Sequence, residues 1–376
     1  MPDPPSKLPL IDLAAQRKRL AGRIEAAIAR VLAHGRFILG PEVEALEQAL
    51  AGRVGVRHAI ACASGTDALV LALLGRGIGA GDAVFVPAFT FAASAEAVAL
   101  AAAVPVLVDV GADFTLDPAS LAEAIAAIGR EGALRPRAVV AVDLFGQPAR
   151  YEDIRPIARA CGLFVLQDAA QSFGAGWRGE PVGRQGDAAA LSFYPSKPLG
   201  AYGDGGAVLT DDDGLVERVR SLARHGVGQG GLHVRIGANS RLDTIQAAIL
   251  LAKLPALDAE RAARARVAER YAEGLEGLVE LPRAREDVEH ACYTVASGRR
   301  DALADGLAAH GIASAVYYRR PLHLHPAYAG FPRAPLPVAE ALAGRVVSLP
   351  MHAYLDPHDQ ARIIATISSL LGEKGS

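Results

Sequence analysis

The sequence predicts an α/β protein, with a large domain built on a doubly wound, mainly parallel sheet and a smaller α+β domain after it. Short apolar runs that suit buried strands alternate with segments whose apolar residues recur at helical spacing, and this alternation is typical of βαβ units. Polar residues stand directly after several of these runs, at the carboxyl edge of the sheet, where ligands bind in such folds.

Two helices are expected first, over residues 20–32 and 42–54, and Gly35 offers a C-cap to the earlier one. The alternation of strands and helices starts after them. Its strands are expected at residues 58–62, 84–86, 104–108, 138–142 and 163–166, and its helices at residues 68–74 and 92–101.

The character of the chain changes near residue 254. An amphipathic helix rich in alanine and arginine is expected over residues 257–275, and it suits a connector between domains. The length of 376 residues also favours two domains, on a prior of about 100–200 residues each. We therefore expect a large domain over residues 10–254 and a small domain over residues 255–376.

Bulk properties disfavour several classes of protein. A net charge of −2 offers no basic field for nucleic acid. The longest apolar run, residues 97–108, is shorter than the roughly 20 residues that cross a bilayer. The polar, proline-rich N-terminus lacks a signal-peptide core, so we expect a cytoplasmic protein that binds neither membrane nor nucleic acid.

The cysteines and histidines predict no metal site. Cys62, Cys161 and Cys292 form no CxxC pair, and the histidines do not cluster at ligand spacing. Each cysteine is expected to be a small core residue in a reducing compartment.

Lys197 is the most informative residue of the sequence. It lies between Pro195 and Pro198 in a segment poor in charge, and four glycines follow within residues 200–206. Burial would lower the pKa of its amine from about 10.4 and free it to attack a carbonyl, which makes Lys197 a Schiff-base candidate. A solvated loop lysine beside a turn explains this stretch alone equally well.

Asp168 and the segment Ser64-Gly65-Thr66 supply two further elements. Asp168 ends a predicted strand, where a carboxylate could face the ring nitrogen of a pyridine cofactor or simply cap a helix. Ser64-Gly65-Thr66 forms a strand-to-helix turn, whose free N–H groups bind phosphate or are merely capped. The three elements together favour a pyridoxal-phosphate site. Gly203-Asp-Gly-Gly206 does not match GxGxxG, so a nicotinamide dehydrogenase is not expected.

On these residues the sequence resembles the DegT/StrS group of nucleotide-sugar aminotransferases, whose architecture is that of fold-type I. The resemblance runs nearly end to end, from residues 10–13 to residues 348–352, and Ser196-Lys-Pro-Leu-Gly200 is highly specific to the group. Further landmarks are Gly35-Arg-Phe-Ile-Leu-Gly-Pro-Glu-Val43, Ser64-Gly-Thr66, Phe89-Thr-Phe91, Gln167-Asp-Ala-Ala-Gln171 and Asn239-Ser-Arg-Leu-Asp243.

The resemblance implies pyridoxal 5'-phosphate as the cofactor. Lys197 would carry it as a Schiff base and shuttle protons, whereas relatives with histidine there dehydrate sugars instead. Asp168 would pair with the ring nitrogen, and Gln171 would contact the ring hydroxyl. Phe91 would stack on the ring, although core packing is its alternative.

The resemblance also implies which residues hold the phosphate, namely Gly65, Thr66, Ser192 and, from the partner subunit, Asn239. A homodimer with shared active sites would then be obligatory.

The most similar sub-group aminates C3 of a UDP-linked 2-acetamido-3-keto-glucuronate with glutamate as donor, for lipopolysaccharide O-antigen. Arg241 would pair with the sugar carboxylate, or else hold the dimer interface or the glutamate. Tyr317, Tyr318 and His323 would contact the sugar. The chain departs from the group at residues 317–319, where relatives commonly read His-Tyr-Pro.

Two alternatives remain open at this stage. One is an aminotransferase for a dTDP- or GDP-linked 3- or 4-keto-6-deoxy sugar. The other is a regulatory or binding relative without turnover, which the joint presence of Lys197, Asp168 and Gln171 disfavours.

Overall fold

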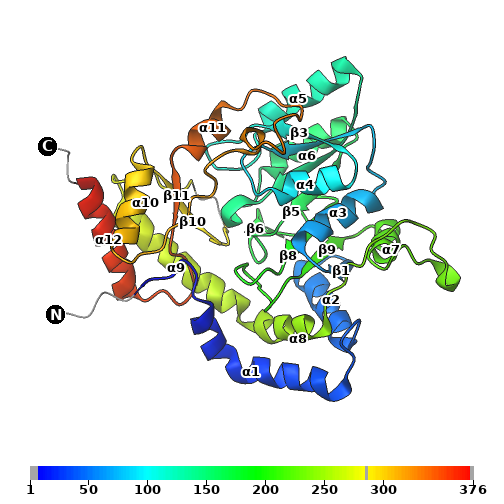
Figure 1. Ribbon diagram of the computed structural model, residues 1–376, viewed down its shortest axis with the longest axis horizontal. Helices are drawn as coiled ribbons and strands as arrows, with labels where there is room; N and C mark the ends of the chain where they lie inside the picture. Colours follow the sequence, from blue (N-terminus) through cyan, green and yellow to red (C-terminus); the bar gives the residue numbers. More distant parts are fainter. Residues whose placement is uncertain (1–6, 284–286, 373–376) are drawn as a thin grey trace.

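The centre of the large domain is a seven-stranded sheet (Figure 1). The computed structural model describes residues 7–283 and 287–372. The strands of this sheet are β1 (His58–Cys62), β2 (Asp82–Pro87), β3 (Val104–Val108), β4 (Arg135–Val142), β5 (Phe164–Asp168), β8 (Ala188–Ser192) and β9 (Gly206–Thr210). Their order is β1-β9-β8-β5-β4-β2-β3, and the five strands from β8 to β3 run parallel. β9 alone runs antiparallel to its neighbours β8 and β1.

Helices cover both faces of the sheet. They are α2 (Pro41–Val54), α3 (Gly65–Gly75), α4 (Ala93–Leu100), α5 (Pro118–Glu131), α6 (Tyr151–Ala160), α7 (Asp213–Leu222) and α8 (Thr244–Lys253). α3, α4 and α7 pack on one face, while α2, α5, α6 and α8 pack on the other. The strands are therefore buried on both sides, which explains why they read as continuous apolar runs.

The small domain contains the antiparallel pair β10 (Tyr293–Ala296) and β11 (Val346–Leu349), together with α10 (Arg300–Ala309) and α12 (Pro357–Gly372). α9 (Leu257–Leu275) runs from the large domain into its core, where Tyr271 packs against Tyr293. α1 (Leu13–His34) lies along α8 at the edge of the large domain (Figure 1).

The chain returns to the large domain between α10 and β11. Leu322 donates its N–H to the carbonyl of Ala88, and Leu107 donates to that of Pro332. α11 (Pro337–Ala343) then packs on the core of the large sheet. The small domain expected over residues 255–376 thus sends one segment across the boundary, and this segment bears Tyr317 and Tyr318.

Most expected elements are confirmed, with shifts at their ends. The first helix begins at Leu13, earlier than expected, because the Asp12 carboxylate accepts the N–H of Ala15 and caps it. Gly35 ends it in the left-handed region, at φ 70°. Shorter elements are β6 (Gly176–Trp177), β7 (Glu180–Pro181), and the 3₁₀ turns η1 (Leu144–Gly146), η2 (Gln229–Gly231), η3 (Leu254–Ala256) and η4 (Leu322–Leu324). Among the described residues, no helix is long and apolar enough to span a membrane.

Candidate cofactor and substrate site

A cavity of about 780 Å³ opens at the carboxyl ends of the parallel strands. Large-domain loops line one side, and the segments around residues 291–292, 317–328 and 348–351 line the other. Nine of the residues predicted from sequence line it: Gly65, Thr66, Phe91, Asp168, Gln171, Ser192, Lys197, Tyr317 and Tyr318. The fold therefore gathers one group from five separate parts of the chain.

Lys197 lies in a tight turn shortly after β8. Its N–H donates to the carbonyl of Tyr194 at 2.8 Å, and the N–H of Ala201 donates to that of Phe193 at 2.8 Å. Burial lowers the pKa of Lys197, and the charge of Asp168 opposes that effect. The turn thus presents a largely desolvated amine to the cavity.

Asp168 is the last residue of β5 and is buried. Its Oδ2 accepts a hydrogen bond from the Ser94 hydroxyl at 2.8 Å, and its Oδ1 accepts the N–H of Ala170 at 3.2 Å. Burial raises the pKa of Asp168, while these two hydrogen bonds and the nearby Lys197 act in the opposite direction. Two donors and a cation therefore favour the ionised carboxylate against its desolvation.

Asp143 lies one strand further along, after the end of β4, and is fully buried. It accepts hydrogen bonds from Gln167 Nε2 at 2.7 Å, Ser172 Oγ at 2.7 Å and Tyr151 OH at 2.8 Å. Burial raises its pKa to about 6. These contacts tie β4 to the loop after β5. In that loop, Gln171 accepts the N–H of Phe145 at 2.5 Å.

The first turn of α3 forms a cradle of backbone N–H groups. Ser64 caps the helix by accepting the N–H of Asp67 at 3.0 Å, and the earlier N–H groups, which have no partner within the helix, belong to residues that line the cavity. A Cβ on Gly65 would lie 2.7 Å from the Cβ of Ser192, so only glycine permits this approach. A helix N-terminus with such close backbone packing suits a phosphate.

These features fit pyridoxal phosphate. Asp168, Lys197 and the α3 cradle border one cavity, with a carboxylate, an amine and an anion site as that molecule requires. Phe91 is 60% exposed, and its ring lies 6.5 Å from that of Tyr318. It is therefore an apolar surface on the cavity and not a core residue.

Three predicted residues do not line the cavity in this chain. His323 is buried, and its Nε2 lies 3.0 Å from Glu340 of α11, so our expectation of a sugar contact there is not supported. Asn239 is exposed on the loop before α8, and Arg241 is half-buried there. Asn239 was expected to act from the partner subunit, and Arg241 was expected to bind the sugar carboxylate or else the dimer interface or the glutamate. The single chain does not test these roles.

The cavity also contains residues outside the predicted set. Two of them are Arg320, two positions after Tyr318, and His325, two positions after His323, in an irregular segment that gives no periodic signal. Ser94, which is not a lining residue but donates to Asp168, had no distinguishing signal in its alanine-rich helix. Cys292, expected in the core, is a lining residue, and burial raises its pKa to about 11. Cys161 is exposed at the end of α6, so its core assignment was wrong.

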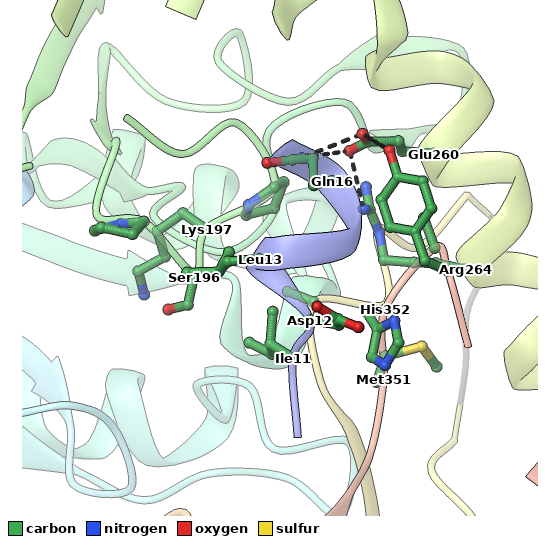
Figure 2. Close-up of a pocket in the computed structure, with 15 residues that line it drawn as sticks. Ile11, Asp12, Leu13, Gln16, Ser196, Lys197, Glu260, Arg264, Met351 and His352 are labelled. Atoms are coloured by element: carbon green, nitrogen blue, oxygen red, sulfur yellow. Dashed lines mark hydrogen bonds and ion pairs between the residues drawn. The ribbon is translucent and has the colours of Figure 1, made fainter. Parts of the chain in front are cut away.

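A small recess of about 40 Å³ lies behind the Lys197 segment (Figure 2). Figure 2 shows Ser196 and Lys197 on one side of it and His352 beside Asp12 on the other. Glu260 of α9 accepts hydrogen bonds from Gln16 at 2.9 Å and from the Tyr354 hydroxyl at 2.5 Å. This network attaches the start of α1 to α9 and lines the same recess as the Lys197 segment. The described residues include no group of metal ligands.

Comparison with known proteins gives consistent matches along the chain. The model of the DegT/DnrJ/EryC1/StrS aminotransferase family matches residues 18–368. The UDP-2-acetamido-2-deoxy-3-oxo-D-glucuronate aminotransferase of Pseudomonas aeruginosa is 44% identical over 363 residues, which are 96% of this chain and 99% of that protein.

Two further matches are a transaminase named for a different nucleotide sugar and a solved structure. The dTDP-3-amino-3,4,6-trideoxy-alpha-D-glucose transaminase of Streptomyces venezuelae is 43% identical over 96% of this chain and 95% of its own. The crystal structure of a DegT DnrJ EryC1 StrS aminotransferase from Brucella abortus superimposes with a TM-score of 0.96 at 50% identity, covering 97% of this chain and all of that one.

Proposed function

This chain belongs to the DegT/DnrJ/EryC1/StrS aminotransferase family, and from that premise we propose that it transfers the amino group of glutamate to a nucleotide-linked keto sugar, with pyridoxal phosphate as cofactor. The observation that carries the proposal is the meeting of Lys197, Asp168 and the α3 cradle in one cavity. Each is a weak signal alone, and a pyridoxal-phosphate enzyme requires all three in one place.

Bound pyridoxal phosphate supplies a carbonyl that takes up the amino group and a ring that withdraws electrons from the reacting carbon. Asp168 holds a proton at the ring nitrogen, because an ionised carboxylate there favours the protonated ring. Gly65, Thr66 and Ser192 hold the phosphate, and Gln171 contacts the ring hydroxyl. Phe91 covers one face of the ring.

Lys197 moves the proton. Because burial lowers its pKa, a larger fraction of its amine is neutral near pH 7, and a neutral amine can accept a proton from the substrate carbon. The same group returns the proton to a neighbouring atom. The hydrogen-bonded turn restrains the backbone of Lys197, which matters because proton transfer would depend steeply on the position of the amine.

For the sugar, we propose C3 of UDP-2-acetamido-2-deoxy-3-oxo-glucuronate, the substrate for which the Pseudomonas aeruginosa relative is named. Tyr317 and Tyr318 line the cavity where a sugar ring would lie beside the cofactor. Arg241 would bind the uronate carboxylate from a second copy of the chain. The product suits the assembly of a surface glycan. A dTDP- or GDP-linked keto sugar is the alternative, since the Streptomyces venezuelae relative is nearly as similar.

We further propose a homodimer with shared sites. The loop from residue 227 to residue 239 carries four exposed apolar side chains, and Phe37 and Ile38 expose two more. The four are Val227, Leu232, Val234 and Ile236. Isolated apolar residues are ordinary on a surface, but several on one loop suit burial in an interface. The partner's Asn239 would then reach the phosphate. The free cysteines are consistent with a cytoplasmic setting.

The test compares the purified protein with Lys197→Ala. After addition of pyridoxal phosphate, the wild type should show a visible absorption band that glutamate shifts, and the variant should not. Keto sugars with and without a C6 carboxylate then distinguish the two substrate classes. A wild type that binds no cofactor would refute the proposal. Cofactor binding without a response to glutamate would instead favour a regulatory relative without turnover.

A further inference from the structure

Lys253 is a lysine held almost entirely inside the large domain. It lies at the end of α8 and is 3% exposed. Its ammonium group donates a hydrogen bond to the carbonyl of Gly200 at 2.7 Å and lies 4.2 Å from the centre of the Tyr202 ring. Both partners belong to the turn that follows Lys197.

A second residue of α8 contacts the same turn. Gln246 accepts the N–H of Tyr202 at 2.8 Å, and a Cβ on Gly203 would lie 3.0 Å from its Nε2. Residues seven positions apart lie on one helical face, so Gln246 and Lys253 approach the turn together. α8 itself is fixed by packing against α1 and α2. One rigid helix therefore holds both ends of the turn over residues 200–203.

The turn is connected directly to Lys197. Ala201 donates to Phe193 at 2.8 Å, and Lys197 donates to Tyr194 at 2.8 Å, so residues 193–201 form a closed loop. Gly200 lies inside this loop, so a shift of Gly200 would be transmitted to the backbone of Lys197. The loop thus connects contacts made outside the cavity to the segment that carries the Lys197 amine.

The charge at this position needs an explanation. Burial lowers the pKa of Lys253 to about 8, and the charge of Glu260 on α9 opposes that effect. An apolar side chain of the same length would fill the space without desolvating a cation. It would leave the carbonyl of Gly200 unpaired, however, and would lose the attraction between the ammonium group and the ring of Tyr202.

We propose that Lys253 is a positioning residue for Lys197, in that its ammonium group holds the Gly200–Tyr202 turn in the arrangement that directs the Lys197 amine into the cavity. The inference rests on the proposed function for its kinetic consequence. Its structural consequence can be measured on the protein without cofactor.

The experiment compares Lys253→Met with the wild type and with Lys253→Arg. Lys18→Met is the control for loss of a lysine, because Lys18 is exposed on α1. Hydrogen exchange of residues 197–203 is measured first, without cofactor. We expect the amides of Ala201 and Tyr202 to exchange about tenfold faster in Lys253→Met, since their anchored turn opens more often. Lys18→Met should exchange like the wild type.

Kinetics and absorption are measured next on the loaded enzyme. In Lys253→Met we expect kcat to fall about ten- to a hundredfold, as for a misplaced catalytic group, with KM for glutamate nearly unchanged. The pH titration of the Lys197–cofactor absorption band should also move. Lys253→Arg, which retains a cation and donors, should recover most of kcat.

Unchanged exchange and kcat in a folded Lys253→Met protein would overturn the proposal, and so would a lower melting temperature with the titration and kcat unaltered. If Lys253→Met does not fold, the variant Gln246→Leu takes its place. It removes the other contact that α8 makes with the turn, and the same outcomes decide the proposal. A wild type without cofactor binding would refute the proposed function, while the exchange comparison would still decide the role of Lys253.

Discussion

Replacing Ser94 by alanine removes a hydrogen bond from the carboxylate that we assign to the cofactor ring. Ser94 donates to Asp168 Oδ2 at 2.8 Å, and Asp168 is only 6% exposed. Burial raises the pKa of Asp168, and the Ser94 hydroxyl is the strongest of the groups that lower it. Without Ser94, Ala170 and Lys197 remain to support the ionised form.

The size of the effect follows from the hydrogen bond that is lost. A hydrogen bond to a charged group stabilises by about 1.5–3 kcal/mol. If that loss is expressed in the step that needs ionised Asp168, the rate with glutamate at neutral pH falls about ten- to a hundredfold. Because the pKa of Asp168 moves further upward, the acid limb of the pH–rate profile should shift to higher pH.

The assay is the half-reaction with glutamate, followed by cofactor absorption in a single turnover across a pH series. Ser94→Thr keeps a hydroxyl at this position and serves as the matched control, with an acid limb close to that of the wild type. An alanine variant that is folded, binds the cofactor and has a wild-type acid limb would refute the role of Ser94. A lower rate with an unmoved limb would do the same, since it would indicate a change of packing alone.

Two other predictions address the cradle and the sheet edge. In Gly65→Ala the new Cβ meets Ser192, and we expect affinity for pyridoxal phosphate to fall about tenfold, or about 1.4 kcal/mol, in a fluorescence titration. Gly52→Ala, with nothing within 4 Å, should bind normally, and equal affinities would contradict the cradle. Burial raises the pKa of Asp143 from 3.8 to about 6 in the folded protein, so the folded state binds this proton more tightly than the unfolded state. The resulting contribution to the free energy of unfolding is fully present below about pH 4 and is lost as pH rises through about 6. The stability advantage of wild type over Asp143→Asn, from urea unfolding, should therefore be larger at pH 5 than at pH 7.5, and a constant difference would exclude Asp143 as its source.

The elements that sequence predicted best are those whose side chains are buried on both faces. β1 and β3 read as continuous apolar runs because helices cover both sides of the sheet. β8 (Ala188–Ser192) was missed because three alanines in a row lack the β-branched residues that indicate a strand. β9, which begins with Gly206 and ends with Thr210, was missed in the same part of the chain. Its antiparallel direction cannot be read from composition.

The candidate site divides in the same way. Asp168 and Ser64 stand at a strand end and a helix start, where a local pattern predicts both the element and the direction of the polar group. Lys197 lies in a turn after β8, which was not predicted, and it was found instead from its flanking prolines and the glycines that follow it. His323 and His325 lie on an irregular segment, only two positions apart. His323 contacts Glu340, whereas His325 lines the cavity. That choice is made by long-range packing of the segment on β2 and β3, which no local window contains.

This division has a consequence for how the site can vary. The groups assigned to the cofactor, Asp168 and Ser192, end strands of one sheet, so a change in their spacing would disturb the core. The groups that we propose for the sugar lie on the segment from Tyr317 to Tyr328, which is attached to the large domain at separate points. The N–H of Leu322 donates a hydrogen bond to the carbonyl of Ala88 at 2.8 Å, and the Tyr328 hydroxyl donates one to Glu96 at 2.9 Å. Side chains between such anchors can change without moving the sheet, so the departure at residues 317–319 should alter the choice of sugar and leave the amino-group chemistry intact.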